Sequence, residues 1–477
     1  MNPINLANFF TKHQPRAYVN ASVRFHHEFT MEQRLAAAER AGWNVFQFPS
    51  EMLKGGDLLS DSGTTTLTAE QMAAMMLGDE AYGSNYGYFK LLEAFEEVWG
   101  IKVENCEIYL FHQGRAAEHA LFTPIGRLGS SLKIPSNGHF DTTRANIESN
   151  GIVAIDCFSE ELHQPGYAPF KGNMNIKKLE DLLAKDANGV PLVYLTLTNN
   201  SGGGQPVSLA NMKAVRKLCD QYNKSLFFDT CRFAENSYFI KTREEEYKNK
   251  TIAEITREVF GLCDGFTISL KKDGLANMGG VLVLKKDSPL LRAHQEIAND
   301  IRDHQILIEG HPTYGGLTGR DIMTIGEGLR TVITEAYLES RVGQVRAFGD
   351  YFKELGIPVL EPFGGHSIYI DTDRFFADTK LKREDYGGIS LTGLLLLKGV
   401  RLCELGAFAF GESHPYNFVR CAVPRNKYEI QDLYYVADCV KGIYDQRDQM
   451  PKAVPVYGKD LTLRHFKARF EFIDYTD

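Results

Sequence analysis

The sequence predicts an α/β fold with a mostly parallel sheet, followed by a smaller α+β domain. Between about residues 108 and 283, short apolar runs alternate with helical segments. Uninterrupted apolar runs are typical of strands covered on both faces, and their alternation with helices indicates parallel strands joined by crossovers. The chain has 477 residues, more than one compact core accommodates, so we expect at least two subdomains.

Six apolar runs mark the expected strands of the large domain. They are residues 107–111, 151–156, 192–197, 225–229, 265–269 and 280–284. Helices are expected from about residue 30, at 211–222 and at 331–355, and a further strand is expected at 368–371. The expected organisation is an N-terminal arm at 1–25, a large cofactor-binding domain at 56–330, and a small domain formed by 26–55 and 331–477.

Composition narrows the class of protein. The net charge is −8 with mixed signs and no long basic stretch, which argues against a nucleic-acid partner. No apolar run has the length of a signal peptide core or a membrane span. The eight cysteines form no C-x-x-C pair, and reduced thiols in a cytoplasmic protein are the expected state.

Ligands of open α/β sheets bind where the strands end, so the residues after each expected strand are informative. Gln113, Gly114 and Arg115 follow the first strand and open a helix. Free amides at a helix start, with an arginine beside them, can hold an anion, although an ordinary strand-to-helix turn has the same pattern. The glycine-rich stretch 201–204 follows the third strand but lacks the dinucleotide spacing G-x-G-x-x-G.

Two later strand ends carry charged residues. Asp229 ends a buried strand, where a carboxylate needs a cation: either Arg232 nearby or a protonated pyridine nitrogen. Ser269 ends another, before Lys271 and Lys272. Two surface lysines in a turn would have the same pattern, but a desolvated lysine can react with an aldehyde. An anion loop, an acidic strand end and a lysine, in this order, are the layout of a pyridoxal-phosphate enzyme.

Longer blocks resemble one family across nearly the whole chain. The blocks are residues 59–64, 75–82, 112–115, 140–143, 203–211, 232–236, 238–240, 271–273, 312–317, 423–425 and 463–466. In them the chain resembles the tryptophanase and tyrosine phenol-lyase group of β-eliminating lyases. That group has the fold-type I, aspartate aminotransferase-like architecture, so the resemblance implies this fold and pyridoxal phosphate as cofactor.

The resemblance implies roles for the cofactor residues. Lys272 would bind the cofactor and remove the substrate α-proton. Phe140 would stack on the pyridine ring and Asp229 would pair with its nitrogen. The remaining implied contacts are the phosphate residues Gln113, Gly114, Arg115, Ser269 and Lys271, and the residues near the 3′-oxygen, Asn200 and Arg232.

The resemblance also implies substrate and cation residues. Arg420 would clamp the α-carboxylate of an amino-acid substrate, a bidentate task suited to guanidinium, and Tyr82 would protonate the leaving group. A monovalent cation, usually potassium, would bind Glu80 and the backbone oxygens of Gly63 and Asn277. A homotetramer with active sites shared across a subunit interface is expected.

Three positions separate the members of the family. Phenol-lyases carry Glu-Arg-Gly where this chain has Glu404-Leu405-Gly406, whereas Asp141 and His465 match residues of the tryptophan-cleaving members. Each residue also has a purely structural interpretation: Asp141 as a helix cap and His465 as a packed histidine. The expected reaction is L-tryptophan to indole, pyruvate and ammonia, with tyrosine phenol-lyase or a cysteine-type β-lyase as the alternative.

Several departures bear on the leaving group. His311 stands at an expected pocket position where relatives have Phe or Met, and Ser60, Leu270 and the stretch 48–56 also differ from the family. A non-catalytic regulator on the same scaffold is disfavoured, because Lys272 and Arg420 are both present and no DNA-binding segment is evident.

Overall fold

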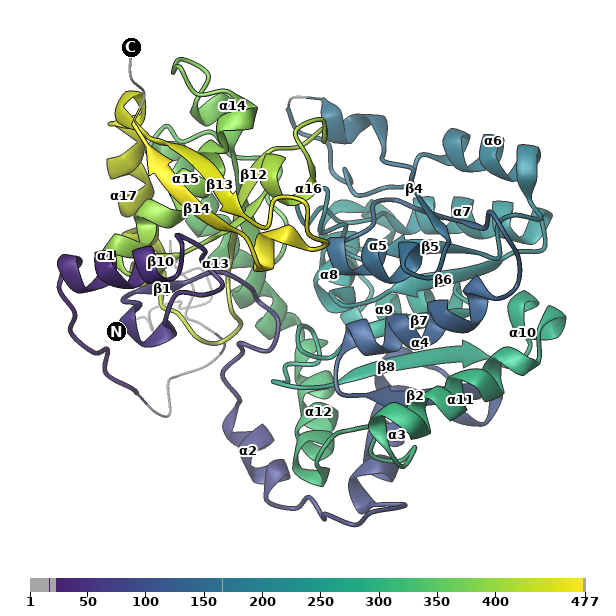
Figure 1. Cartoon of the computed structure of the whole chain (residues 1–477). Coiled ribbons are helices and arrows are strands. Elements are labelled where there is room, and N and C mark those ends of the chain that lie inside the picture. Colours follow the sequence, from purple (N-terminus) through teal and green to yellow (C-terminus); the bar gives the residue numbers. More distant parts are fainter. Residues whose placement is uncertain (1–16, 18–22, 165, 475–477) are drawn as a thin grey trace, which may run out of the picture.

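The computed structural model describes residues 17, 23–164 and 166–474, so most of the arm expected at 1–25 lies outside the described residues. Figure 1 shows a large α/β part in blue and teal, beside a smaller part in green and yellow that the purple segment joins. Across the described residues, no helix combines the length and apolar character that crossing a bilayer requires.

A seven-stranded sheet in the order β2-β8-β7-β6-β5-β3-β4 forms the large part. The strands are β2 (Cys106–Phe111), β3 (Lys133–Ser136), β4 (Val153–Asp156), β5 (Leu192–Thr196), β6 (Ser225–Asp229), β7 (Gly265–Ser269) and β8 (Gly280–Lys285). Only β8 runs against its neighbours, so the predicted mostly parallel sheet is confirmed. The sequence did not predict β3, which has four residues and contains Pro135, a residue unfavourable in strands.

Helices cover both faces of this sheet. On one face are α4 (Gly114–Gly126), α5 (Asp141–Glu148), α10 (Pro289–Ala293) and α11 (Glu296–Glu309), packed in one apolar core. On the other are α3 (Tyr86–Trp99), α6 (Ile176–Asp186), α7 (Leu209–Gln221), α8 (Phe233–Arg243), α9 (Ile252–Gly261) and α12 (Gly319–Val332). Because both faces are covered, the strand ends are where the sheet remains open to ligands.

The smaller part has its own core and sheet. Strands β11 (Cys403–Leu405), β12 (Phe418–Ala422) and β9 (Ser367–Asp371) form an antiparallel sheet in that order. Its other elements are α1 (Met31–Arg40), α13 (Glu335–Glu354), α14 (Thr372–Phe375), α15 (Gly387–Leu395), α16 (Ala407–Phe410), α17 (Ile430–Tyr444), the pair β1 (Gly56–Asp57) and β10 (Val400–Arg401), and the hairpin β13 (Lys452–Tyr457) and β14 (Arg469–Ile473). The remaining helix, α2 (Ala69–Met75), packs on α12.

The predicted helix at 331–355 is divided in two. Helix α12 ends at Val332 and α13 begins at Glu335, with Thr334 between them donating its hydroxyl to the Thr331 carbonyl at 2.8 Å. A run of β-branched residues with a hydroxyl that bonds the backbone favours such a break. Helix α13 packs its first half in the large core and its second half in the small one. The domain boundaries at 56 and 331 stay predictions.

Candidate active site

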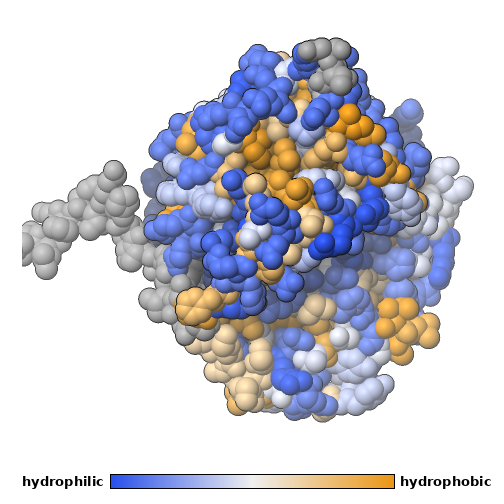
Figure 2. All heavy atoms as spheres, turned by 60° about the vertical axis from the view of Figure 1, so that its left-hand side comes forward, coloured by the Kyte–Doolittle hydropathy of each residue, from blue (hydrophilic) through white to orange (hydrophobic). Residues whose placement is uncertain are grey.

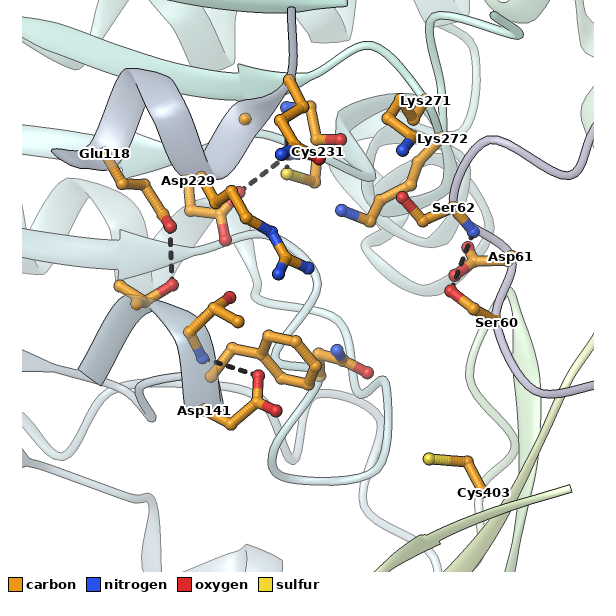
Figure 3. Close-up of a pocket in the computed structure, with 18 of the residues that line it drawn as sticks. Ser60, Asp61, Ser62, Glu118, Asp141, Asp229, Cys231, Lys271, Lys272 and Cys403 are labelled. Atoms are coloured by element: carbon orange, nitrogen blue, oxygen red, sulfur yellow. Dashed lines mark hydrogen bonds between the residues drawn. The ribbon is translucent and has the colours of Figure 1, made fainter. Parts of the chain in front are cut away.

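A cavity lies between the strand ends of the large sheet and the small sheet, and most of the predicted site residues line it. These are Gln113, Gly114, Arg115, Phe140, Asp141, Asn200, Asp229, Arg232, Ser269, Lys271, Lys272, Arg420 and His465. They come from the segments after β2, β3, β5, β6 and β7 and from the small domain. Figure 3 shows Lys272 reaching toward the middle, with Asp229 and Glu118 on one side and Asp61 on the other.

One end of the cavity is cationic. Helix α4 begins at Gly114 without a side-chain cap, and a Cβ at this position would lie 2.7 Å from the Ser269 Cβ. Only glycine permits this approach, which brings the helix start against the end of β7. Burial, followed by repulsion from Lys272 and Arg115, lowers the pKa of Lys271. An anion here would be stabilised by the helix start and relieve that repulsion.

The opposite side carries two buried carboxyls. Asp229 ends β6 and accepts the Cys231 N–H at 3.1 Å. Glu118, one turn into α4, accepts the Thr143 hydroxyl at 2.6 Å. Burial and then the charge of Asp229 raise the pKa of Glu118 to about 7. Such a carboxylate pair favours a cationic partner such as a protonated ring nitrogen.

Arg232 does not form the local ion pair with Asp229 that was one of the two alternatives from the sequence. Its Nε and Nη2 donate instead to Asp61, at 3.0 and 2.8 Å. Burial disfavours the Asp61 carboxylate, but the charges of Arg232 and Arg425 outweigh it and hold its pKa well below the usual range. Arg232 is therefore fixed by a segment far away in the sequence, and the charge of Asp229 is left for a ligand.

Arg420, on β12, is buried and only partly satisfied. Its Nη2 donates to the Leu59 carbonyl at 3.0 Å and its Nη1 to Asn200 Oδ1 at 3.4 Å. Its Nε is buried without a partner among the described residues. The guanidinium therefore keeps donors for a ligand, and a carboxylate is the group that its planar fork binds best.

The far end of the cavity combines one ion pair with apolar side chains. His465 Nε2 lies 3.0 Å from Asp141 Oδ2, and both side chains are almost fully buried. Asp141 is also the first residue of α5, and its Oδ1 accepts the Thr142 N–H at 2.6 Å. The helix-start role and the pairing with histidine therefore coexist. The apolar wall consists of Phe46, Leu59, Cys403, Leu405 and Phe466.

Four predicted residues do not line this cavity. Tyr82 is 73% exposed, with its ring 5.7 Å from that of His311. Glu80 pairs with Arg320 at 2.9 Å. Gly63 and Asn277 do meet, since Asn277 Nδ2 donates to the Gly63 carbonyl at 3.1 Å. A single chain thus brings together neither Tyr82 with Lys272 nor Glu80 with Gly63. The expectation that His311 lines the pocket is also not met within one chain.

Comparison with known proteins decides the family. The model of the family described as "Beta-eliminating lyase" matches residues 57–423. This chain belongs to that family. The lyase is 41% identical to a tryptophanase of Salinibacter ruber over 86% of each chain. It is 38% identical to a tyrosine phenol-lyase of Symbiobacterium thermophilum over 93% of this chain and 95% of that one.

The fold agrees with this placement. The threonine aldolase of Leishmania major superposes with a TM-score of 0.55 at 14% identity, over 82% of the lyase and 99% of that chain. The architecture is the fold-type I arrangement predicted from the sequence, and the lyase is a pyridoxal-phosphate-dependent carbon–carbon lyase. The cavity fits that cofactor, because cations gather at one end, Asp229 at the other has no ion-pair partner among the described residues, and Lys272 lies between them.

Sequence reasoning missed several residues that line the cavity of the lyase. Glu118 had a usable signal: it follows Gly114 by four residues and therefore lies on the same face of α4. Asp61 lies within a block that marks the family, but nothing in its neighbours indicated a buried arginine partner. Phe46 and Cys403 had no signal, because their place in the wall depends on how the small domain packs against the large one.

Proposed function

We propose that this lyase cleaves L-tryptophan to indole, pyruvate and ammonia by β-elimination. The observation that carries the proposal is the Asp141–His465 pair, 3.0 Å apart at the apolar end of the cavity. Leu405 stands in that wall where a phenol-specific enzyme would place an arginine. An apolar slot with one buried acceptor suits a flat aromatic ring that carries a single N–H.

The cofactor would lie across the strand ends. Its phosphate would bind the start of α4 together with Arg115, Ser269 and Lys271, and Gln113 would lie beside it. Phe140 would cover the ring, and Asp229 would keep the ring nitrogen protonated. Asn200 and Arg232 would lie near the 3′-oxygen. When linked to the substrate amino group in place of Lys272, pyridoxal phosphate would stabilise negative charge at the substrate α-carbon, and the Lys272 amine would be free.

Two residues would act on the amino-acid part of the substrate. Arg420 binds the α-carboxylate through donors that the protein leaves free, which fixes the α-carbon beside Lys272. The Lys272 amine takes the α-proton and then holds it away from water. The neutral form of the amine is the one that accepts this proton.

Residues at the apolar end of the cavity would act on the leaving group. Protonation of an indole ring at carbon makes its N–H more acidic, and a carboxylate that accepts this N–H stabilises the change. Asp141 would accept that N–H, and His465, whose Nε2 lies 3.0 Å from Asp141 Oδ2, would hold its second oxygen. The proton itself would come from Tyr82, which a second copy of the chain must supply, because within one chain Tyr82 points to solvent.

We propose that the chain forms a homotetramer in which two copies complete each site. Tyr82 lies beside the end of α11, since its ring contacts His311 just after that helix. Exposed apolar side chains also occur on the segments that precede Tyr82 and His311 in the chain, among them Met76 after α2 (82% exposed) and Leu307 in α11 (83%). Figure 2 shows apolar residues gathered at the lower end of the molecule, where α2 lies in Figure 1. A patch of this kind marks a surface that another protein covers.

The same arrangement would complete a potassium site. The backbones of Gly63 and Asn277 approach closely, since a Cβ on Gly63 would lie 2.8 Å from the Asn277 carbonyl oxygen. Glu80 of a second copy would supply the charged oxygen ligand. An all-oxygen site suits a hard monovalent cation.

The test of the reaction uses holoenzyme in potassium buffer with L-tryptophan, L-tyrosine and S-methyl-L-cysteine as separate substrates. Pyruvate reports elimination from any of them, and indole, phenol or methanethiol identifies the leaving group. Indole release far above phenol release is the expected result. Pyruvate from the cysteine analogue alone would retain the β-elimination and reject tryptophan as the substrate.

The shared site is tested by mixing two inactive variants. K272A chains and Y82F chains, dissociated and reassembled together, should regain activity, because some sites then contain both Lys272 and Tyr82. A mixture that stays inactive would contradict the shared site. Replacing potassium by tetramethylammonium should lower the activity, and E80A should abolish the difference between the two salts.

A further inference from the structure

A buried network of charges joins the two domains beside the cofactor lysine. Its members, all almost fully buried, are the carboxylates Asp61, Glu235 and Asp273 and the guanidiniums of Arg232, Arg341 and Arg425. The side chain of His366 is buried among them, and burial followed by the charge of Arg232 holds its pKa well below the usual range, so it is neutral. Three negative charges thus face three positive ones.

Arg425 is the centre of this network. It follows the end of β12, and its side chain enters the large domain. Nη1 donates to Asp61 at 2.9 Å, and Nη2 donates both to Glu235 at 2.8 Å and to Asp273 at 2.7 Å. One guanidinium therefore connects the segment around Asp61, the first turn of α8 and the segment that carries the cofactor lysine.

Asp273 depends on Arg425 alone. Asp61 has a second partner in Arg232, and Glu235 has one in Arg341, at 3.1 Å. Among the described residues, Asp273 has no ion-pair partner other than Arg425. A buried carboxylate without a cation is costly, so loss of Arg425 should destabilise the charged form of Asp273 more than that of Asp61 or Glu235. Burial and then Glu235 already raise the pKa of Asp273 to about 6.

Asp273 in turn fixes the backbone of Lys272. Its Oδ2 accepts the N–H groups of Ala234 and Glu235, at 2.8 and 3.2 Å, at the start of α8, where the N-cap residue provides no side-chain cap. Its own N–H donates to the Cys231 carbonyl at 3.2 Å. Asp273, the residue after the lysine, therefore makes three hydrogen bonds to backbone groups, and Arg425 balances its charge.

We infer that Arg425 is a positioning residue that fixes the cofactor lysine, through Asp273, relative to the substrate arginine Arg420 on the preceding strand β12. Arg420 and Arg425 are five residues apart, and Arg420 of β12 donates to the carbonyl of Leu59, two residues before Asp61. The segment from Arg420 to Arg425 would thus bind the substrate carboxylate at one end and, through Asp273, hold the lysine that takes the α-proton at the other. This inference rests on the role proposed for Lys272 but not on the identity of the leaving group.

The test compares R425Q with R341Q in purified holoenzyme. Both remove a buried arginine that contacts Glu235, but only R425Q removes the partner of Asp273. Cofactor affinity from fluorescence titration, and the pH dependence of the bound cofactor's absorbance, report on Lys272 without turnover. R425Q should weaken cofactor binding about tenfold or more and shift the absorbance titration, since a buried charge loses its pair, whereas R341Q should change both by less than about threefold.

A double variant separates positioning from folding. D273N/R425Q removes both charges, and the side-chain carbonyl that D273N retains can still cap α8, so the double variant should bind the cofactor better than R425Q does. Equal effects of R425Q and R341Q, or a double variant no better than R425Q, would overturn the inference.

Borohydride reduction of the wild-type holoenzyme, followed by peptide mass analysis, should mark Lys272. If another lysine is marked, the proposed role of Lys272 fails and the inference fails with it. If Lys272 is marked and R425Q leaves the absorbance titration unchanged, only the inference fails.

Discussion

The two ends of the active-site cavity are built in different ways. The cofactor end is charged and comes from strand ends of one sheet, with α4, β6 and β7 placing Arg115, Asp229 and Lys272. The leaving-group end is apolar apart from Asp141 and His465, and its wall comes mostly from the small domain and residues 46–59. Under the proposed function, the shared chemistry would depend on one sheet and the specificity on how the two domains meet.

The strongest way to test the cofactor end is K272A. Removal of the amine should lower kcat for every substrate by at least about 10³-fold, because proton transfer by a positioned group accounts for a factor of that order. Pyruvate formation from L-tryptophan and S-methyl-L-cysteine measures it. K271A is the matched comparison and should mainly weaken cofactor binding. Equal losses of kcat in the two variants would contradict the assignment of the base to Lys272.

The leaving-group end should respond selectively. D141N keeps the shape of Asp141 but removes the charge that would accept the indole N–H and face His465, so tryptophan cleavage should fall by about 10²-fold. Cleavage of S-methyl-L-cysteine, which has no ring, should change by less than about threefold. Comparison of kcat/KM for the two substrates checks this. A similar loss with both would place Asp141 at the shared end of the cavity instead.

Arg420 connects the two ends, since every substrate presents a carboxylate. R420K keeps the positive charge but loses the planar fork, and should raise KM for all substrates by about tenfold. The ratio of indole to methanethiol formed from equimolar substrates should stay constant. A change in that ratio would show that Arg420 also contacts the leaving group.

The expected effect at Glu118 is on stability and not on turnover. Its folded-state pKa of about 7 lies above the value of 4.5 for an unperturbed glutamate. The folded apoprotein therefore keeps a proton that the unfolded chain loses, and this contribution to stability falls as pH rises from about 4.5 to about 7. The difference in unfolding free energy between wild type and E118Q should decrease over this range by up to about 3 kcal/mol. A difference that does not vary with pH would show an ordinary pKa for Glu118.

The sequence determined most of the sheet and the cofactor end. Covered strands such as 225–229 are continuous apolar runs, and a residue at a strand end is placed by the chain itself, which is why the order of residues predicted that Asp229 and Lys272 would meet at one edge of the sheet. Resemblance to the family added Arg420, Asp141 and His465, and the structure brings all three to the same cavity.

Only the tertiary structure decided what depends on contacts between distant segments. A local pair with Asp229 was one of two alternatives for Arg232, yet Arg232 binds Asp61, 171 residues away, and Arg425 reaches Asp273 across the domain junction. Tyr82 was predicted for the active site, yet within one chain it faces solvent. Local sequence fixes backbone periodicity and strand ends, whereas partners of buried charges are set by packing, because a desolvated ion pairs with whatever counter-charge the fold brings within reach.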